Sequence, residues 1–587
     1  MIRSLHFRAV PEPRTADAAR PIGTYERKSA GVLDWDPRVV NVAARVVALV
    51  AGRRPDIRVE HIGSTAVEGL PGKGIVDLAV EVEADEVPAV TDMLLDLGFQ
   101  RQPGPDPFPA VRPMLVGALD VDGETFRIHF HVQPRHHPVW SGGYARELRF
   151  RDALRADPGL VRNYAALKRG IVETGRDGRV DALAYTHAKT IWIRDVYRRL
   201  GIGFEPIVPP ATIGILGGGQ LGRMLALAGR ELGYRIAVLD PDPSCPAAAV
   251  ADRVEVGAYD DVAAAIRLAE GSAVATYELE HVSAALADAL DERIRLRPGT
   301  YPLRVAQDRL AERQFLTRYE LGVAPWREVR TEADLRVAAA ELGLPLRLKV
   351  AIGGYDGRSQ LRIRDDAEIG ASLGRLGRPA GETVLVEREL AFDAELSVVC
   401  ARAADGETAA YPVARNVHDG GILVESSAPA EIDESVAAEA TDIARRIATY
   451  LGLVGVVTVE LFLLADGSLL VNEIAPRVHN SGHWTIEAAA TSQFEQHVRA
   501  ICGLPLGSTA LVSPAAATVN LLGLGAERPA QPIGVEAALA VQGAHLHLYY
   551  KRLVRERRKM GHVTALGASP ADALATAREA QSRLGWA

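Results

Sequence analysis

A proline-rich stretch near residue 208 divides this chain of 587 residues into two parts. The stretch, GIGFEPIVPPATIG at residues 201–214, contains three prolines, and proline lacks the amide hydrogen that the interior of a helix or a sheet requires. A single hydrophobic core rarely serves more than about 300 residues, so a chain of this length needs several domains. We place the main boundary near Val208 and expect each part to have its own core.

Charge and composition exclude several classes of protein. The chain has 67 basic and 75 acidic residues, a net charge of −8, whereas binding nucleic acid independently of sequence requires a positive surface. No apolar run reaches the roughly 18 residues of a membrane span, and the first residues lack the apolar core of a signal peptide. Cys245, Cys400 and Cys502 are too far apart to predict a zinc site or a disulfide framework. We therefore expect a cytoplasmic protein that binds neither nucleic acid nor a membrane.

A strand, a glycine-rich turn and a helix follow the proline-rich stretch. IGILGGG, QLGRMLALAGRELG and YRIAVLDPD predict a parallel α/β sheet, while VLVEREL, AELSVVCARA, VVTVELFLL and SLLVNEIA further on predict antiparallel strands. The turn GGGQLG at 217–222 has the spacing of a dinucleotide fingerprint, and Asp240 ends the next strand, where a ribose-binding carboxylate would lie. A phosphate-cradling loop, the dinucleotide site of an oxidoreductase and a purely structural turn all remain open.

A β-hairpin is predicted around Asp466-Gly467, which separates two apolar runs. If these two residues form the whole loop, Glu460 faces Glu473, and the same register pairs Leu464 with Leu469 and Phe462 with Val471. Like charges directly opposed on neighbouring strands are destabilising, so the two glutamates need a cation between them. Magnesium, held by carboxylates and nucleotide phosphates, fits this role, and two exposed glutamates at a hairpin end are the alternative.

Two further stretches predict anion binding. NEIAPRVHNSGHWTIEA concentrates polar side chains directly after the hairpin, at Arg477, His479, Asn480, Ser481 and His483. LRLKVAIGGYDGRSQ places Lys349 at a strand end before a glycine-rich turn, where a lysine can contact phosphate, although a surface hairpin without a role also fits. Lysine is rare in this chain, which suggests positions that need a compact ammonium group. The lysines are Lys28, Lys73, Lys168, Lys189, Lys349, Lys551 and Lys559.

From Thr212 to about Gly567 the chain resembles the N5-carboxyaminoimidazole ribonucleotide synthetase family. The strings that carry the resemblance are GILGGGQLGRML, TYELEHV, GGYDGRSQ, VEREL-AFDAELSV, YPVARNVHDGGIL, NEIAPRVHNSGHWTIEAAATSQFEQHVRAI and RRKMGHVT, in the family's order. The resemblance implies a biotin-independent ATP-grasp ligase of purine biosynthesis. It would use ATP, Mg²⁺ and bicarbonate to carboxylate 5-aminoimidazole ribonucleotide through carboxyphosphate, and it would form a homodimer.

The resemblance also implies roles for individual residues. Glu460 and Glu473 match the metal ligands. The ATP contacts match Arg309, Lys349, Gly354, Tyr355, Asp356, Gly357, Arg358, Ser359, Gln360, Glu387, Arg388, Glu389, Leu390, Glu395, His418, Asn472 and Glu473. The catalytic set comprises Arg477, His479 and Lys559, which match the residues that handle carboxyphosphate and the ribonucleotide. Apart from the resemblance, Glu278 and Glu280 share one face of a predicted strand and could orient bicarbonate, while an ordinary solvated strand end remains open for one of them. The ribonucleotide contacts are Gly218, Gly219, Gln220, Leu221, Asn480 and Ser481. Val478 and Ser359 depart from the family's usual proline and glycine, and neither removes a chemical group.

Residues from about Tyr25 to Arg199 resemble the GrpB-like family, which has a nucleotidyltransferase-type fold. HIGSTAVEGLPGKGIVDLAVEV, ELRFRDALRADPGLVRNYAALK and AYTHAKTIWI carry this resemblance. Gly63-Ser64 followed by Asp77 suggests a phosphate-binding turn and a metal-binding carboxylate. The second carboxylate of such a site is missing at Ala79, and Glu81 lies about 6.6 Å further along the strand. A nucleotide-binding or regulatory module, a transferase and a structural appendage remain open.

His129 and His131 in RIHFHV share one face of a predicted strand. They could bind a metal, or they could be two polar residues satisfied by other partners.

The predicted fold class is α/β and α+β, in several domains. We expect a nucleotidyltransferase-like domain at 1–205, a Rossmann-like pre-ATP-grasp domain at 206–305, an ATP-grasp lid at 306–395, an ATP-grasp body with the metal hairpin at 396–510 and a small β-rich C-terminal domain at 511–587. The small-molecule partners would be the three substrates, with a further nucleotide at the N-terminal domain. Two other functions are a dinucleotide-dependent oxidoreductase using GGGQLG and a non-catalytic nucleotide-binding fusion.

Overall fold

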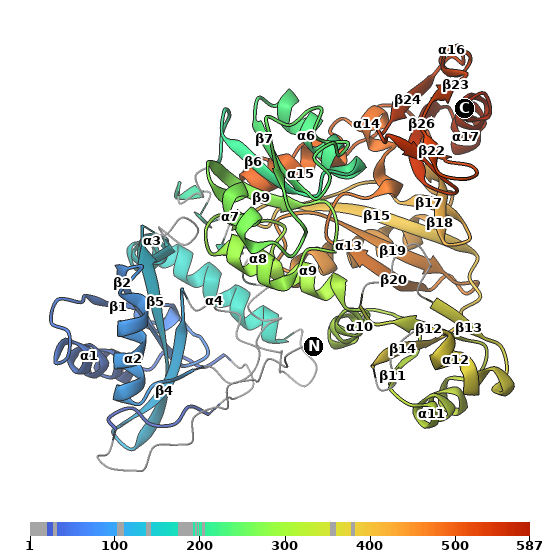
Figure 1. Cartoon of the computed structure of the whole chain (residues 1–587). Coiled ribbons are helices and arrows are strands. Elements are labelled where there is room, and N and C mark those ends of the chain that lie inside the picture. The colour runs from blue at the N-terminus through green and yellow to red at the C-terminus, as the bar shows by residue number, and fades with distance from the viewer. Residues whose placement is uncertain are drawn as a thin grey trace, which may run out of the picture. The chain divides into compact units, whose positions relative to one another are not determined.

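The computed structural model of the chain describes residues 20–26, 32–101, 111–136, 143–173, 189, 192–193, 196–197, 199–201, 206–352, 360–376 and 382–587. It divides into two units, Met1–Ile202 (unit 1) and Gly203–Ala587 (unit 2), whose boundary is close to the predicted one near Val208. Each unit is described by itself (Figure 1). In the described part of the chain, no helix is long and apolar enough to cross a membrane.

Unit 1 is built on a five-stranded sheet of order β1-β2-β5-β4-β3, in which only β2 and β5 run parallel. Its elements are α1 (Arg38–Ala51), β1 (Val59–Ile62), the 3-10 turn η1 (Ser64–Ala66), β2 (Ile75–Glu83), α2 (Val87–Leu97), β3 (Gln100–Arg101), β4 (Met114–Val121), β5 (Glu124–Arg135), α3 (Gly143–Ala156) and α4 (Pro158–Glu173). Alternate β2 residues, Val76, Leu78 and Val80, are buried in one core with α1 and α2. The residues between them therefore face the opposite side of the sheet.

Unit 2 opens with the predicted parallel α/β sheet, of order β10-β9-β6-β7-β8. The strands are β6 (Thr212–Leu216), β7 (Arg235–Asp240), β8 (Arg253–Val256), β9 (Ser272–Tyr277) and β10 (Arg295–Leu296), and the helices are α6 (Gln220–Glu231), α7 (Val262–Ala269) and α8 (Ala284–Asp291). α7 and α8 cover one face, and α6 packs with α15 (Gln493–Cys502) on the other (Figure 1). Two helices, α9 (Thr300–Gln307) and α10 (Arg309–Arg318), lead out of this sheet.

A second, antiparallel sheet of order β11-β14-β12-β13 falls within the segment predicted as a lid. Its elements are β11 (Trp326–Val329), α11 (Glu332–Leu342), β12 (Leu346–Val350), β13 (Gln360–Ile363), η3 (Asp366–Glu368), α12 (Ile369–Arg375) and β14 (Val384–Arg388). α11 and α12 share a small core with these strands. This subdomain therefore has its own core, which a segment must have if it is to move as one body.

The largest sheet has nine strands, of order β20-β19-β15-β17-β18-β21-β26-β24 with β16 beside β15. The strands are β15 (Ala394–Arg402), β16 (Thr408–Ala410), β17 (Ala414–Asp419), β18 (Ile422–Ala428), β19 (Gly455–Leu463), β20 (Leu469–Ala475), β21 (Ala515–Leu522), β24 (Ala544–Leu548) and β26 (Lys559–Gly567). β21, β24 and β26 belong to the segment expected as a separate C-terminal domain, and they extend the sheet of the body.

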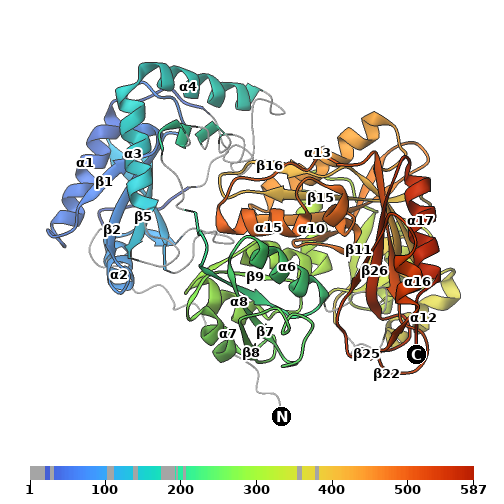
Figure 2. The same ribbon diagram turned by 90° about the horizontal axis from the view of Figure 1, so that it is seen from above.

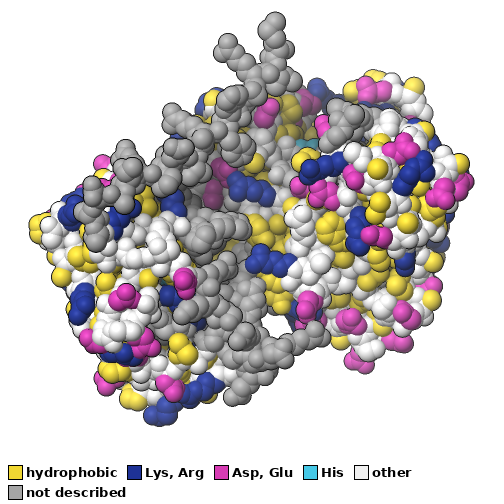
Figure 3. Space-filling view, turned by 90° about the horizontal axis from the view of Figure 1, so that it is seen from below, with side chains coloured by type: hydrophobic (Ala, Val, Ile, Leu, Met, Phe, Trp, Pro, Cys, Tyr) yellow, Lys and Arg dark blue, Asp and Glu magenta, His cyan; other side chains and the backbone are white. Residues whose placement is uncertain are grey.

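Helices and short strands complete this part of unit 2. They are α13 (Glu434–Tyr450), η4 (Asn480–Gly482), α14 (Thr485–Ala488), α16 (Val535–Leu539) and α17 (Pro570–Ser582), with the pairs β22 (Arg528–Pro529)/β25 (Leu553–Val554) and β23 (Pro532–Ile533)/β27 (Gly585–Trp586). α13 and α15 pack on the β15–β19 part of the sheet, and α17 packs on β21 and β26 (Figure 2). On the face drawn in Figure 3, basic and acidic side chains are mixed over the described surface.

Candidate active site

The hairpin of β19 and β20 places Glu460 opposite Glu473, as predicted, but by a different route. Leu461 pairs with Val471 and Leu463 pairs with Leu469, so the prediction of a two-residue loop was wrong. The loop is longer than two residues, and a hydrogen bond from Leu464 N–H to Ser468 O, at 3.0 Å, closes it. A β-bulge next to Glu460 then takes up one extra residue and restores the facing pair.

Three carboxylates act on one another at this end of the hairpin. Burial and the charge of Glu473 raise the pKa of Glu460 to about 7. Burial also raises the pKa of Glu312, to about 7. The charge of Arg313 lowers this pKa in part, and the charge of Glu473 raises it further. Asn472 Nδ2 donates to Glu460 Oε2 at 3.3 Å, so the side chain next in the chain to Glu473 helps to hold the pair. This concentration of negative charge fits a divalent cation.

A buried chain of charges connects the lid strands to the hairpin. Lys349 Nζ lies 2.5 Å from Glu387 Oε2, and Arg313 Nε also donates to Glu387. Arg313 continues to Glu312 at 2.9 Å and to the backbone oxygen of Asn472 at 2.7 Å. Although burial alone would raise it, the charges of Lys349 and Arg313 lower the pKa of Glu387 to about 2. The contact with Glu387 thus fixes the Lys349 side chain beside the hairpin, where a phosphate contact would need it.

Glu312 and Arg313 were not predicted from the sequence. Both are buried, and at about 100° per residue they flank the buried Leu316 on the inner side of α10. Charged residues at positions that the helical period assigns to the core were the available signal.

The other predicted ATP contacts lie around this chain of charges. Gln360 pairs with Lys349 across β12 and β13, and Arg309 N–H donates to Ala351 O at 2.9 Å. Arg388 Nε donates to Leu342 O at 2.6 Å, and half-buried Leu390 follows Glu389. Glu389 accepts from Arg347 and Arg362.

Glu395 pairs with His418. Burial would lower the pKa of this histidine, but Glu395 and Glu460 raise it. The predicted contacts Gly354, Tyr355, Asp356, Gly357, Arg358 and Ser359 lie outside the described residues.

Arg477 and His479 converge beside the carboxylates. Arg477 Nε lies 2.7 Å from Glu280 Oε1, and His479 Nε2 lies 3.7 Å from Glu460 Oε1. Burial and the charge of Arg477 lower the pKa of His479 well below its usual range, so its imidazole is neutral. Gln493, another residue missed from the sequence, fixes this turn by accepting from His479 N–H and donating to His479 O, at 2.9 and 2.7 Å.

The glycine loop is braced by carboxylates. Glu278 lies just beyond the end of β9, not on a strand face as predicted, and accepts from the amides of Gly219 and Gly222. Burial raises the pKa of Glu278. Asp240 accepts from Gly218 N–H and from Tyr259 Oη, both at 2.7 Å, so it is engaged inside the protein and not presented to a ribose.

The start of α6 and the lysines of the C-terminal strands meet next to this loop. The first amides of a helix have no intrahelical partner, which makes those of Gln220 and Leu221 the donors that α6 can offer an anion. Lys551 Nζ donates to Gln220 Oε1 at 2.7 Å and to Lys559 O at 2.6 Å, so two of the rare lysines lie beside the start of α6.

Polar residues after the hairpin complete the site. Ser481 Oγ lies 3.0 Å from His479 Nδ1 and accepts from Ser397 Oγ at 2.9 Å. Asn480 is buried, and within the described structure both polar atoms of its amide lack a hydrogen-bond partner. Buried amides are rarely left unpaired, so Asn480 has the character of a substrate-binding group.

Comparison with known proteins assigns three consecutive domain families to unit 2. Residues 210–307 match the ribonucleotide synthetase preATP-grasp domain, residues 314–494 the ATP-grasp domain, and residues 516–576 the phosphoribosylaminoimidazole carboxylase C-terminal domain. In unit 1, residues 31–199 match the GrpB protein family, which confirms the predicted fusion. Fold and site together define unit 2 as an ATP-grasp ligase.

Several relatives share the whole length of unit 2. The N5-carboxyaminoimidazole ribonucleotide synthase of Brucella melitensis is 44% identical over 360 residues, which are 61% of this chain and 97% of that protein. The structure of the Thermus thermophilus synthetase has a TM-score of 0.57 at 43% identity, covering 63% of this chain and 97% of that one. That of the Aspergillus clavatus enzyme, in complex with ADP and aminoimidazole ribonucleotide, has a TM-score of 0.57 at 29% identity, covering 64% and 99%. The chain belongs to the N5-carboxyaminoimidazole ribonucleotide synthase family.

Proposed function

We propose that unit 2 carboxylates 5-aminoimidazole ribonucleotide with ATP and bicarbonate, through carboxyphosphate. The observation that carries this proposal is the meeting of the Glu460–Glu473 pair with the buried Lys349–Glu387 ion pair and the neutral His479. This arrangement supplies a cation site, a phosphate contact and a proton acceptor at one place. The relative from Aspergillus clavatus binds ADP and the ribonucleotide, which are a product and a substrate of this reaction.

The first step transfers the γ-phosphoryl group of ATP to a bicarbonate oxygen, with ADP as the leaving group. Glu460 and Glu473 would hold Mg²⁺, which supplies charge neutralisation on the nucleotide phosphates. Lys349, fixed by Glu387, contacts the phosphates as a point charge. Gln360 and Glu395 with His418 border the same space and are proposed as further nucleotide contacts.

The second step forms the bond between the ribonucleotide amine and the carboxyl carbon, and inorganic phosphate leaves. Arg477, oriented by Glu280, binds the anionic carboxyphosphate, and His479 accepts the proton that the amine loses. The amides of Gln220 and Leu221, together with Lys559, bind the ribonucleotide phosphate, while Asn480 pairs with a polar group of the substrate. In this scheme Glu278 positions the glycine loop through Gly219 and Gly222 and does not touch bicarbonate.

Carboxyphosphate reacts readily with water, so the site must close during turnover. The subdomain of β11–β14, with its own core under α11 and α12, is our candidate for the closing body. From the family resemblance we also propose a homodimer that works in the cytoplasm, which light scattering on the purified protein and fractionation of cells would check.

For unit 1 we propose the binding of a nucleotide. Lys168 is buried, and the charge of Asp77 acts on both Lys168 and Lys189, which places two lysine side chains near one carboxylate. Burial lowers the pKa of both lysines, that of Lys168 to about 6. Equilibrium dialysis of the full chain with ADP should give two nucleotides per chain, and one in a Lys168→Met variant. One nucleotide per chain in the unaltered protein would refute this part of the proposal.

The ligase activity is tested with purified protein, ATP, magnesium, bicarbonate and aminoimidazole ribonucleotide. ADP release should depend on the ribonucleotide and disappear in Glu473→Gln, whereas Glu439→Gln, on the exposed side of α13, should keep full activity. Release of ADP that does not respond to the ribonucleotide, or a fully active Glu473→Gln variant, would overturn the assignment of this site.

A further inference from the structure

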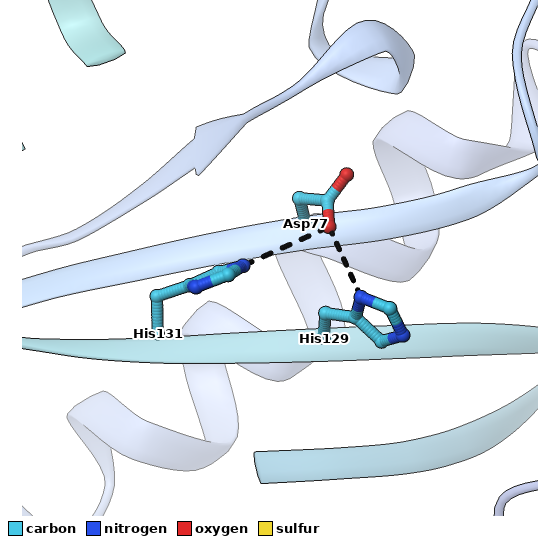
Figure 4. A group of neighbouring side chains, drawn as sticks. All are labelled: Asp77, His129 and His131. Carbon is cyan, nitrogen blue, oxygen red and sulfur yellow. Dashed lines mark ion pairs between the residues drawn. The ribbon is translucent and has the colours of Figure 1, made fainter. Parts of the chain in front are cut away.

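Three potential metal ligands meet in unit 1, far along the chain from the ligase site. β2 and β5 run parallel and place Asp77 beside His129 and Ala79 beside His131. Neighbouring residues on adjacent strands point to the same face, so the three polar side chains lie together, opposite the core that α1 and α2 share with the sheet (Figure 4). The small side chain of Ala79 leaves room for His131 to turn toward Asp77.

The distances suit coordination better than hydrogen bonding. Asp77 Oδ1 lies 3.5 Å from His129 Nδ1 and 3.8 Å from His131 Nε2, both longer than an ordinary N–H···O bond. One ligand atom from each side chain lies within 4.8 Å of the other two. Ligand atoms bound about 2.1 Å from one metal are about 3.0–3.4 Å apart, so a small inward movement would close the site.

We propose that Asp77, His129 and His131 form a site for one divalent transition metal in unit 1. Two imidazoles and one carboxylate are a donor set for zinc, iron, cobalt or manganese, and they leave coordination positions open. This inference rests on the proposed nucleotide binding by unit 1 and adds a metal to that site. Its test measures metal binding and needs no nucleotide.

The surroundings of His129 support its role as a ligand. Tyr25 Oη lies 3.1 Å from His129 Nε2, the ring nitrogen that faces away from Asp77. Metal-bound histidines are commonly held in this way by a partner on the second nitrogen. The side chains of Asp77, His129 and His131 are 25%, 18% and 15% exposed, so an ion can reach them from solvent.

The same residues argue against a magnesium pair held by carboxylates. The strand position two residues after Asp77 is Ala79, and Glu81 lies 3.3 Å from Arg135 Nε, in an ion pair of its own. Magnesium strongly prefers oxygen ligands, whereas this site offers two nitrogens. The missing second carboxylate is therefore replaced by histidines from the neighbouring strand.

The connection between β1 and β2 packs closely on Asp77 and places Ser64 and Lys168 close to each other. Gly63 has a φ of 71°, and a Cβ there would lie 2.4 Å from Asp77 Oδ2, so only glycine allows this turn to pack on the carboxylate. Later in the same β1–β2 connection, a Cβ at Gly72 would lie 2.3 Å from Ser64 Oγ and 3.8 Å from Lys168 Nζ. A divalent ion held by one carboxylate and two neutral imidazoles keeps a net positive charge, which predicts an oxyanion such as phosphate as the further ligand.

The test is Co²⁺ binding to the metal-free full chain, followed by visible absorption. We expect one nitrogen-ligated Co²⁺ per chain, whose spectrum differs from that of Co²⁺ on carboxylates alone, at least about tenfold weaker binding at this site in His129→Gln and in His131→Gln, and a change in the spectrum on adding inorganic phosphate. His136→Gln, an exposed histidine near the end of β5, is the matched control and should bind as the unaltered chain does.

Glu473→Gln separates this site from the ligase site, because it should lose ADP release and keep the Co²⁺ spectrum. Circular dichroism checks that each variant is folded. Unchanged Co²⁺ affinity in folded His129→Gln and His131→Gln variants would overturn the metal site. A spectrum that phosphate leaves unchanged would overturn the proposed anion ligand.

Discussion

Replacing Glu460 by glutamine should stabilise the metal-free protein while it removes the cation site. Burial and Glu473 raise the pKa of this carboxyl from 4.5 to about 7. At about 1.4 kcal/mol per pKa unit, ionised Glu460 destabilises the fold by about 3 kcal/mol. The carboxyl is protonated in both states below its unfolded pKa, so the penalty is absent there. It grows as the pH rises through 4.5 to 7 and is complete above the folded value.

Scanning calorimetry in the presence of a chelator measures this effect. Glu460→Gln should raise the free energy of unfolding of unit 2 by up to about 3 kcal/mol at pH 8, and by clearly less at pH 5. Adding Mg²⁺ and ADP should stabilise the unaltered protein by about 2.7 kcal/mol at a hundredfold excess over Kd, and the variant far less. Glu439→Gln, an exposed glutamate on α13, is the control and should follow the unaltered protein at both pH values.

Two results would refute this reasoning. One is a Glu460→Gln variant that is less stable than the unaltered protein at pH 8 without metal. The other is a gain in stability that is equal at pH 5 and pH 8, because it would not come from the ionisation of Glu460.

Three further variants probe the rest of the site. Glu387→Gln leaves the buried Arg313 and the half-buried Lys349 without their carboxylate and should destabilise unit 2 by about 3–5 kcal/mol in urea unfolding at pH 7. Because the pKa of Glu387 is lowered to about 2, this difference should shrink as the pH falls below 4.5, and a constant difference would contradict it. Glu278→Gln weakens the brace of the glycine loop, so steady-state kinetics should show a higher KM for the ribonucleotide and a nearly unchanged KM for ATP; equal increases would argue against a local role. Arg477→Lys keeps the charge but loses the planar donor geometry, so the ratio of carboxylated product to ADP should fall about tenfold, and an unchanged ratio would remove Arg477 from carboxyphosphate binding.

Local sequence patterns predicted most of the elements because strand and helix periods are local properties. The parallel opening sheet, the antiparallel strands of the body and the position of Lys349 near the end of its strand followed from them. The hairpin shows the limit: the facing of Glu460 and Glu473 was confirmed, yet the loop was longer than two residues and a bulge compensated. Turn chemistry predicts that a hairpin exists, but a bulge depends on the contacts of the whole sheet.

Contacts between distant segments were harder to predict. Glu312, Arg313 and Gln493 act through partners more than ten residues away, so spacing within one segment gave no measure of their role. Glu278 was expected on a strand face, and β9 ends one residue earlier, which turns this side chain to the glycine loop. In unit 1 the sequence shows that Ala79 stands where a second carboxylate would be needed. That His131 lies beside Ala79 depends on the parallel pairing of β2 and β5, which is a tertiary contact.

The most direct test of the central claim follows bicarbonate oxygen through the ligase reaction. With bicarbonate labelled in its oxygens, the proposed route predicts one labelled oxygen in each inorganic phosphate released, because the γ-phosphoryl group passes through carboxyphosphate, and labelled oxygen in the carboxylated ribonucleotide. Phosphate that carries no label while ADP is released would contradict the account, since water and not bicarbonate would then have accepted the phosphoryl group.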